Sequence, residues 1–182
     1  TRTPTQAIAF ARDESKLPTK NWNNLCLQFV RTCYRVPPRE PNARLGWANA
    51  KKRHKTSNAA SIPAGVPVWW NTKTTNDHGA ISAGNGMCYS TDVPRGKVGL
   101  IGINDLSKRW GATLLGWTED LNGVRVYTPP AKPKPPAKKS VAQLAAEVIA
   151  GKWGNGADRK RRLTAAGHNY AKVQAEVNRR LK

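Results

Sequence analysis

The sequence predicts an α+β domain with an antiparallel sheet, joined by a spacer to a small three-helix bundle. Helical patterns come first in the chain, strand-like patterns dominate from residue 62 to residue 127, and five prolines alternate with lysines within residues 128–139. Helices followed by a run of strands favour an α+β arrangement. A segment rich in Pro and Lys favours an extended spacer. The predicted modules are residues 1–128, a linker at 129–139, and residues 140–182.

The large module begins with a helix predicted at residues 24–34, which Pro37 and Pro38 end. A second helix is predicted at about residues 45–52. From residue 62 onward, short runs rich in β-branched and aromatic residues predict strands. These strands are expected at residues 66–70, 78–83, 87–93, 98–103, 114–121 and 124–127.

The turn Gly84-Asn85-Gly86 sets the register of one predicted hairpin. A three-residue turn pairs Ile81 with Tyr89 and His78 with Asp92. A two-residue turn would shift this pairing and bring another residue opposite His78.

The small module shows clear helix start and stop signals. Ser140 and Gln143 fit a capping box, apolar residues follow at helical spacing, and Gly151 ends the helix. A second short helix is predicted at about residues 158–166. A third carries an apolar stripe at residues 170, 173, 177 and 181. Three helices in so few residues predict a minimal bundle.

Cys26 and His78 form the strongest candidate for catalysis. Cys26 falls in the first turn of a predicted helix if Asn23 or Asn24 is the N-cap, and His78 opens a predicted strand. A helix N-terminus and a neighbouring histidine lower the pKa of a thiol and supply a proton acceptor. Asp92, opposite His78 in the predicted hairpin, is the candidate to hold the imidazole tautomer.

The remaining cysteines and histidines are assigned structural roles. Cys33 and Cys88 are predicted to be buried thiols. Cys33 lies two helical turns from Cys26, roughly 10 Å by helix rise, which is too far for a disulfide. His54, in a basic run, and His168 are predicted to be surface residues. No close-spaced zinc motif and no acidic calcium loop occurs, so we predict no metal and no cofactor.

The chain has 182 residues and a net charge of +20, from 31 basic and 11 acidic side chains. Such a charge attracts polyanions, either nucleic acid or an anionic bacterial wall. No apolar run approaches the roughly 20 residues of a membrane helix, so no membrane insertion is expected. The first residues lack the pattern of a secretory signal and the chain starts without Met.

Several motifs occur in a fixed order along the large module, at residues 24–31, 62–70, 78–81, 84–86, 90–92, 115–117 and 122–124. Together they resemble the CHAP domain, a cysteine- and histidine-dependent amidohydrolase/peptidase, over residues 10–127. The resemblance implies a papain-like, NlpC-P60-like fold with N-terminal helices and an antiparallel sheet. It also implies Cys26 as nucleophile and His78 as base, with Asp92 as third residue and Asn104 or Asp105 as alternatives.

Substrate contacts are expected from a few further residues. The oxyanion hole would combine the backbone N–H of Cys26 with the side chain of Gln28 or Asn21. Tryptophans are more often core residues, but Trp69 and Trp70 are candidates to line a substrate groove.

In the small module, the string Gly-Lys-Trp-Gly-Asn-Gly at residues 151–156 is followed by Asp-Arg-Lys at residues 158–160. With the surrounding residues 144–178, this string is similar to a three-helix cell-wall-binding repeat of certain phage lysozymes. The resemblance implies binding to the muropeptide unit of peptidoglycan. The residues expected to contact the wall are Lys152, Trp153, Asn155, Asp158, Arg159 and Arg162.

The leading hypothesis is therefore a phage endolysin, or a related wall hydrolase, that cuts a peptidoglycan amide by cysteine catalysis. We favour an N-acetylmuramoyl-L-alanine amidase. An endopeptidase that cuts the stem or cross-bridge would use the same chemistry. A non-catalytic basic binder of wall polymer or nucleic acid is the rival, although no element that reads a specific nucleic acid is recognisable.

The resemblance also bears on where the protein acts. It implies a protein that is made in the host cytoplasm without a signal peptide, and that reaches the bacterial wall through a holin-made pore. We expect a monomer. A trimmed secreted enzyme is the alternative.

Overall fold

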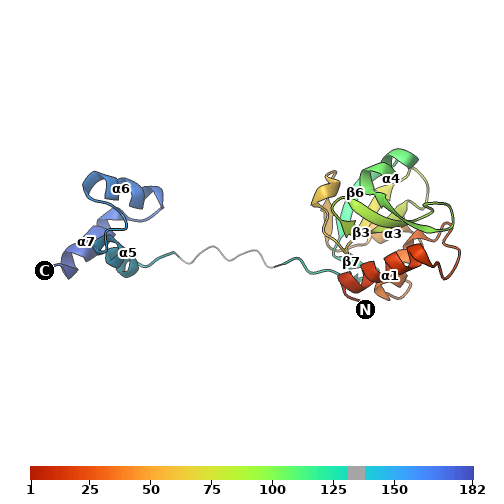
Figure 1. The fold of residues 1–182 in the computed structure, drawn as a ribbon, viewed down its shortest axis with the longest axis horizontal. Coiled ribbons are helices and arrows are strands. Elements are labelled where there is room, and N and C mark those ends of the chain that lie inside the picture. The colour runs from red at the N-terminus through yellow and green to blue at the C-terminus, as the bar shows by residue number, and fades with distance from the viewer. Residues whose placement is uncertain (131–137) are drawn as a thin grey trace. The chain divides into compact units, whose positions relative to one another are not determined.

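The computed structural model describes residues 1–130 and 138–182 and forms two compact units, Thr1–Pro130 and Ala131–Lys182 (Figure 1). The linker predicted at residues 129–139 falls mostly outside the described residues. The first unit is a mixed α+β structure with an antiparallel sheet, which confirms the predicted class. Within the described residues, no helix is long and apolar enough to cross a membrane.

The first unit is built around a six-stranded sheet with the order β1-β6-β2-β3-β4-β5, in which all neighbouring strands are antiparallel. A separate two-stranded ribbon, β7-β8, follows β6. The strands are β1 (Arg53–Lys55), β2 (Pro67–Asn71), β3 (His78–Gly84), β4 (Met87–Thr91), β5 (Val98–Gly102), β6 (Thr113–Thr118), β7 (Asp120–Leu121) and β8 (Val124–Arg125).

Helices cover both faces of the sheet, because successive strand side chains point to opposite faces. On one face, Ile81 and Tyr89 pack with residues of α1 (Pro4–Lys16) and α2 (Cys26–Tyr34). On the other face, Ala80 and Cys88 pack with residues of α4 (Ile103–Trp110). A third helix, α3 (Ala43–Ala48), and a 3-10 turn, Ala59–Ser61, complete the unit.

Three elements of the first unit were not predicted from the sequence: α1, α4 and β1. The start of α1 carries a recognisable signal, because Thr3 and Gln6 form a capping box and Pro4 is the first helical residue. In contrast, α4 lies between two predicted strands, in a part of the chain with a strand-like pattern, so no helix was predicted there. It begins directly after β5, and Gly111, in a left-handed conformation, ends it.

The β3-β4 hairpin has the predicted register at its centre but not the predicted turn. Ile81 pairs with Tyr89 as expected. The turn contains only two residues between Gly84 and Met87, and a bulge between Ser82 and Gly84 absorbs the extra residue. The bulge therefore restores at Ile81 the pairing that a three-residue turn would give.

The second unit consists of α5 (Val141–Ile149), α6 (Gly156–Ala165) and α7 (Tyr170–Arg180). The capping box of Ser140 and Gln143 is present. The core contains residues of all three helices: Leu144, Ala145, Val148, Leu163, Val173 and Val177. Leu181 does not continue the predicted apolar stripe, because α7 ends before it and its side chain is 68% exposed.

Candidate functional site

Cys26 is the first residue of α2, and its side chain is partly exposed. The predicted N-cap was wrong: Leu25 occupies that position, and it makes no side-chain cap hydrogen bond. Asn24 instead adopts a left-handed backbone conformation, with φ of 58°. The Cys26 sulfur accepts hydrogen bonds from the backbone N–H groups of Gly79 and Leu27. The Cys26 side chain therefore links the start of α2 to β3.

His78, the first residue of β3, is only 6% exposed. Its Nε2 lies 2.9 Å from the Ser90 hydroxyl, and that hydroxyl donates to the Thr91 carbonyl at 3.0 Å. When the Ser90 hydroxyl donates to the Thr91 carbonyl, its oxygen accepts from His78 Nε2–H. We assign the imidazole to this Nε2–H tautomer, in which Nδ1 keeps its lone pair for accepting a proton.

Two tryptophans enclose the His78 ring. The Trp110 ring packs edge-on against it at 4.6 Å between centroids, and the Trp70 ring lies at 5.9 Å. Burial lowers the pKa of His78 to about 3. The imidazole is consequently neutral over the whole physiological pH range.

The protonation state of Cys26 differs from the prediction that its helix position and His78 would lower its pKa. Burial raises the pKa of the Cys26 thiol, the N–H groups of Gly79 and Leu27 oppose this effect, and the negative charge of Asp92 adds to it. The free protein therefore holds a neutral thiol and a neutral imidazole. In such a pair, the base must remove the proton as the sulfur attacks.

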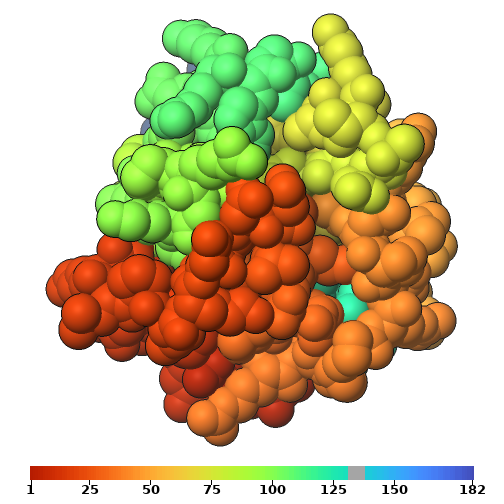
Figure 2. Space-filling view, turned by 90° about the vertical axis from the view of Figure 1, so that its right-hand side faces the viewer, coloured from red at the N-terminus to blue at the C-terminus, as the bar shows by residue number. Residues whose placement is uncertain are grey.

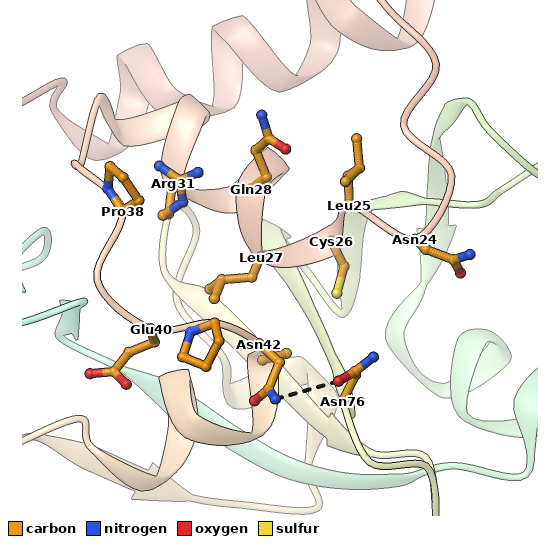
Figure 3. A pocket seen from close by; sticks show the side chains of 12 residues that line it. Asn24, Leu25, Cys26, Leu27, Gln28, Arg31, Pro38, Glu40, Asn42 and Asn76 are labelled. Atoms are coloured by element: carbon orange, nitrogen blue, oxygen red, sulfur yellow. Dashed lines mark hydrogen bonds between the residues drawn. The ribbon is translucent and has the colours of Figure 1, made fainter.

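Cys26 and His78 face two neighbouring cavities, both of which Asn24 lines. Cys26 opens into a cavity of about 220 Å³, and His78 opens into one of about 550 Å³. In Figure 3, the Cys26 sulfur points toward Asn42 and Asn76, which are hydrogen-bonded to each other at 3.4 Å. Both Cys26 and His78 are described residues, and no direct hydrogen bond joins them in the free protein; Gly79 links them through the backbone.

Asp92 does not hold His78; Ser90 does. Asp92 lies one residue beyond β4 and has φ of 62°, so the chain leaves the sheet before the carboxylate can reach the ring. Its oxygens instead accept from the Asn24 N–H at 3.1 Å and the Gly96 N–H at 3.0 Å. Asp92 therefore positions the loop that precedes Cys26. The alternatives, Asn104 and Asp105, are exposed on α4 and line neither cavity.

Trp69 and Trp70 cannot contact a substrate, because they are 1% and 0% exposed. Their indole N–H groups donate to Thr118 and Ser107 within the unit, which satisfies them in the core. Gln28 is partly exposed and lines the cavity of Cys26. In Figure 3 its amide points away from the Cys26 sulfur.

Sequence reasoning missed three residues of this site: Ser90, Trp110 and Asn24. Ser90 lies two residues before Asp92, and alternation along a strand puts both on the face of His78 in the predicted hairpin, so the signal for Ser90 was available. Asn21, the other oxyanion candidate, lies outside both cavities, and its side-chain oxygen accepts from the Asn23 N–H at 2.9 Å.

In the second unit, some of the predicted wall-binding residues are paired within the unit and others are exposed. Arg159 is engaged by the Gly154 carbonyl and by the side chains of Gln174 and Asn155, at 3.0–3.1 Å. Asp158 pairs with Arg161 and Arg162.

Trp153 is partly exposed, and its indole N–H donates to Glu147 at 2.9 Å. Lys152 is exposed. The structure thus leaves Lys152, Asn155 and Arg162 exposed and Trp153 partly exposed, while Arg159 is held within the unit.

Comparisons with known proteins characterise the second unit. Residues 142–181 match the CW_7 repeat family. The second unit therefore contains a cell-wall repeat. No curated protein and no solved structure matches the chain. Within the described residues, no group of three or more His, Cys, Asp or Glu side chains is placed to hold a metal ion.

Proposed function

We propose that the first unit hydrolyses an amide bond of peptidoglycan by cysteine catalysis, as a CHAP-type wall hydrolase of the endolysin kind. The observation that carries this proposal is the placement of Cys26 and His78. A thiol at a helix N-terminus is hydrogen-bonded to the residue that follows a buried, neutral histidine of fixed tautomer. A wall repeat in the same chain supplies the substrate class.

In the proposed reaction Cys26 is the nucleophile, and His78 acts as base and acid. As Cys26 Sγ attacks the amide carbonyl, its proton passes to His78 Nδ1. The C–N bond then breaks, His78 returns the proton to the leaving amine, and the acyl group stays on sulfur as a thioester. Water attacks the thioester while His78 again takes a proton, which releases a carboxylic acid and restores the thiol.

Ser90 and the backbone support this proton transfer without entering it. The Ser90 oxygen accepts from His78 Nε2–H, so positive charge that develops on the ring is stabilised by a fixed dipole. The Gly79 and Leu27 N–H groups contact the sulfur and favour its thiolate character during attack.

The second unit would hold the enzyme on its insoluble substrate. Of the accessible wall candidates, Lys152 supplies a positive charge and Trp153 supplies an aromatic surface. A single repeat gives binding without avidity, which suits an enzyme that has to move between bonds.

The test is mass spectrometry of the fragments that are released from purified peptidoglycan. The wild type should generate new ends that are missing with Cys26→Ala. Stem peptides that begin at L-alanine would identify the favoured amidase activity. A cut within the stem or cross-bridge would identify an endopeptidase.

Cys33→Ala is the matched control, because Cys33 lies on the same helix but is fully buried. It should release the same fragments as the wild type. If the wild type and Cys26→Ala both released nothing from several wall types, the hydrolase proposal would be refuted, and binding alone would remain.

A further inference from the structure

The cavity beside His78 is walled by four segments that are distant in the sequence. Its lining comprises Asn23 and Asn24, Thr72, Thr74 and Asp77, Asp92 and Arg95, and Arg109 and Trp110, with His78. In Figure 2, the yellow segment near residue 75 and the green segments that contain residues 95 and 109 surround the orange-red segment near residue 23. The cavity therefore opens on this face of the first unit.

Two arginines of this cavity have no carboxylate partner among the described residues. Arg109 is exposed and makes no hydrogen bond or ion pair with them. Arg95 donates only to the Asn23 side-chain oxygen, at 3.3 Å. Both guanidinium groups thus remain available to a ligand.

The two carboxylates of the cavity are already engaged by the protein. Asp77 accepts from the Thr72 N–H at 3.1 Å and lies 4.0 Å from Arg44. Asp92 accepts from two backbone N–H groups. Neither carboxylate makes a direct contact with Arg95 or Arg109, so the hydrogen-bonding positions of both guanidinium groups are not occupied by a carboxylate of the cavity.

The roles of Cys26 and His78 in the proposed reaction indicate which side of the scissile amide lies in this cavity. His78 returns its proton to the leaving amine, and His78 faces this cavity, whereas the acyl carbon has to lie at Cys26, which faces the other cavity. The amine side of the scissile amide therefore extends toward Arg95, Arg109 and the partly exposed Trp110.

We propose that this cavity is a subsite for an acidic peptide on the amine side of the scissile bond, and that Arg95 and Arg109 bind its free carboxylate. This assignment rests on the proposed function. A guanidinium binds a carboxylate through two parallel hydrogen bonds, which a carboxamide cannot reproduce. The subsite would therefore distinguish stem peptides with a free carboxylate from those in which it is amidated.

The test uses two muropeptides that differ only in a carboxylate or a carboxamide on the stem peptide, on the amine side of the scissile amide. The wild type should cleave the acidic one with a kcat/KM about 10- to 100-fold higher, the range expected for charge-assisted hydrogen bonds. Arg109→Gln should lower kcat/KM for the acidic peptide more than for the amidated peptide, and so reduce this preference.

Lys108→Gln is the matched control, because it removes the same charge from the adjacent residue of α4, which does not line the cavity. It should keep the preference. Equal cleavage of both peptides by the wild type, or an equal loss on both with Arg109→Gln, would overturn the subsite and leave the hydrolase proposal intact.

Binding by calorimetry separates failure of the subsite from failure of the hydrolase proposal. In the Cys26→Ala background, Arg109→Gln should weaken binding of the acidic peptide about 10- to 100-fold and binding of the amidated peptide much less. If Arg109→Gln weakened binding of both peptides equally, or of neither, the subsite would be overturned. Absence of cleavage by the wild type, with the difference in binding retained, would refute only the hydrolase.

Discussion

Burial of a neutral His78 should make the first unit sensitive to acid. Its pKa is about 3 in the folded protein, against 6.5 for an ordinary histidine. Because the folded pKa is the lower one, the unfolded chain binds the proton more readily between these values, and stability falls as the pH decreases from 6.5 toward 3. One pH unit corresponds to about 1.36 kcal/mol. At pH 6.5 the unfolded histidine is already half protonated, so between pH 6.5 and 4.5 His78 alone should remove about 2.3 kcal/mol from the free energy of unfolding.

Urea unfolding of the wild type and of His78→Gln at pH 7 and pH 4.5 would measure this loss. Of the seven tryptophans, only Trp153 lies outside the first unit, so fluorescence reports mainly on that unit. Glutamine is neutral at both pH values and can still donate to Ser90. Between pH 7 and pH 4.5 the wild type should therefore lose about 2.5 kcal/mol more than the variant, since contributions from other groups cancel in the difference. Equal losses would show that His78 is not held neutral by burial, and the proposed proton transfer would need revision.

Three further predictions follow from single contacts. Ser90→Ala leaves a buried His78 Nε2–H without its acceptor and should lower the free energy of unfolding by about 1–3 kcal/mol at pH 7; an unchanged urea midpoint would contradict this. Asp92→Asn removes a charge that raises the pKa of Cys26, so alkylation of Cys26 by iodoacetamide should reach half its maximal rate at a lower pH than in the wild type, and a shift to higher pH would count against this role. Leu163→Ala empties a fully buried position and should destabilise the second unit by about 2–5 kcal/mol, seen as lost helical circular dichroism and weaker co-sedimentation with cell walls; a fully helical, wall-binding variant would show that Leu163 does not hold the bundle together.

Local sequence patterns predicted most of the sheet, because strands buried on one or both faces carry dense apolar and aromatic runs. The class, the central pairing of Ile81 with Tyr89, and the capping box of α5 all followed from local rules. The helix α4 could not be found in this way. Its eight residues are defined by packing against the far face of the sheet, where Ile103 and Leu106 are buried.

The site was predicted less completely than the fold. Cys26 and His78 were located by residue type at the start of an element, but their pKa values depend on burial, which the sequence does not report. The position of Asp92 depends on one left-handed backbone conformation after β4, which moves its carboxylate from the ring to the Asn24 N–H. Trp69 and Trp70 followed the general tendency of tryptophan to be buried.

The hydrogen bond between Asp92 and the Asn24 N–H has a consequence for the synthesis of the protein on the ribosome. It joins residues that are 68 positions apart, so the loop before Cys26 reaches its final form only after the strand that delivers Asp92 has been synthesised. A nascent chain on the ribosome would therefore carry Cys26 well before the residue that aligns the loop in front of it. The candidate site takes its final geometry only once residue 92 has been added to the chain.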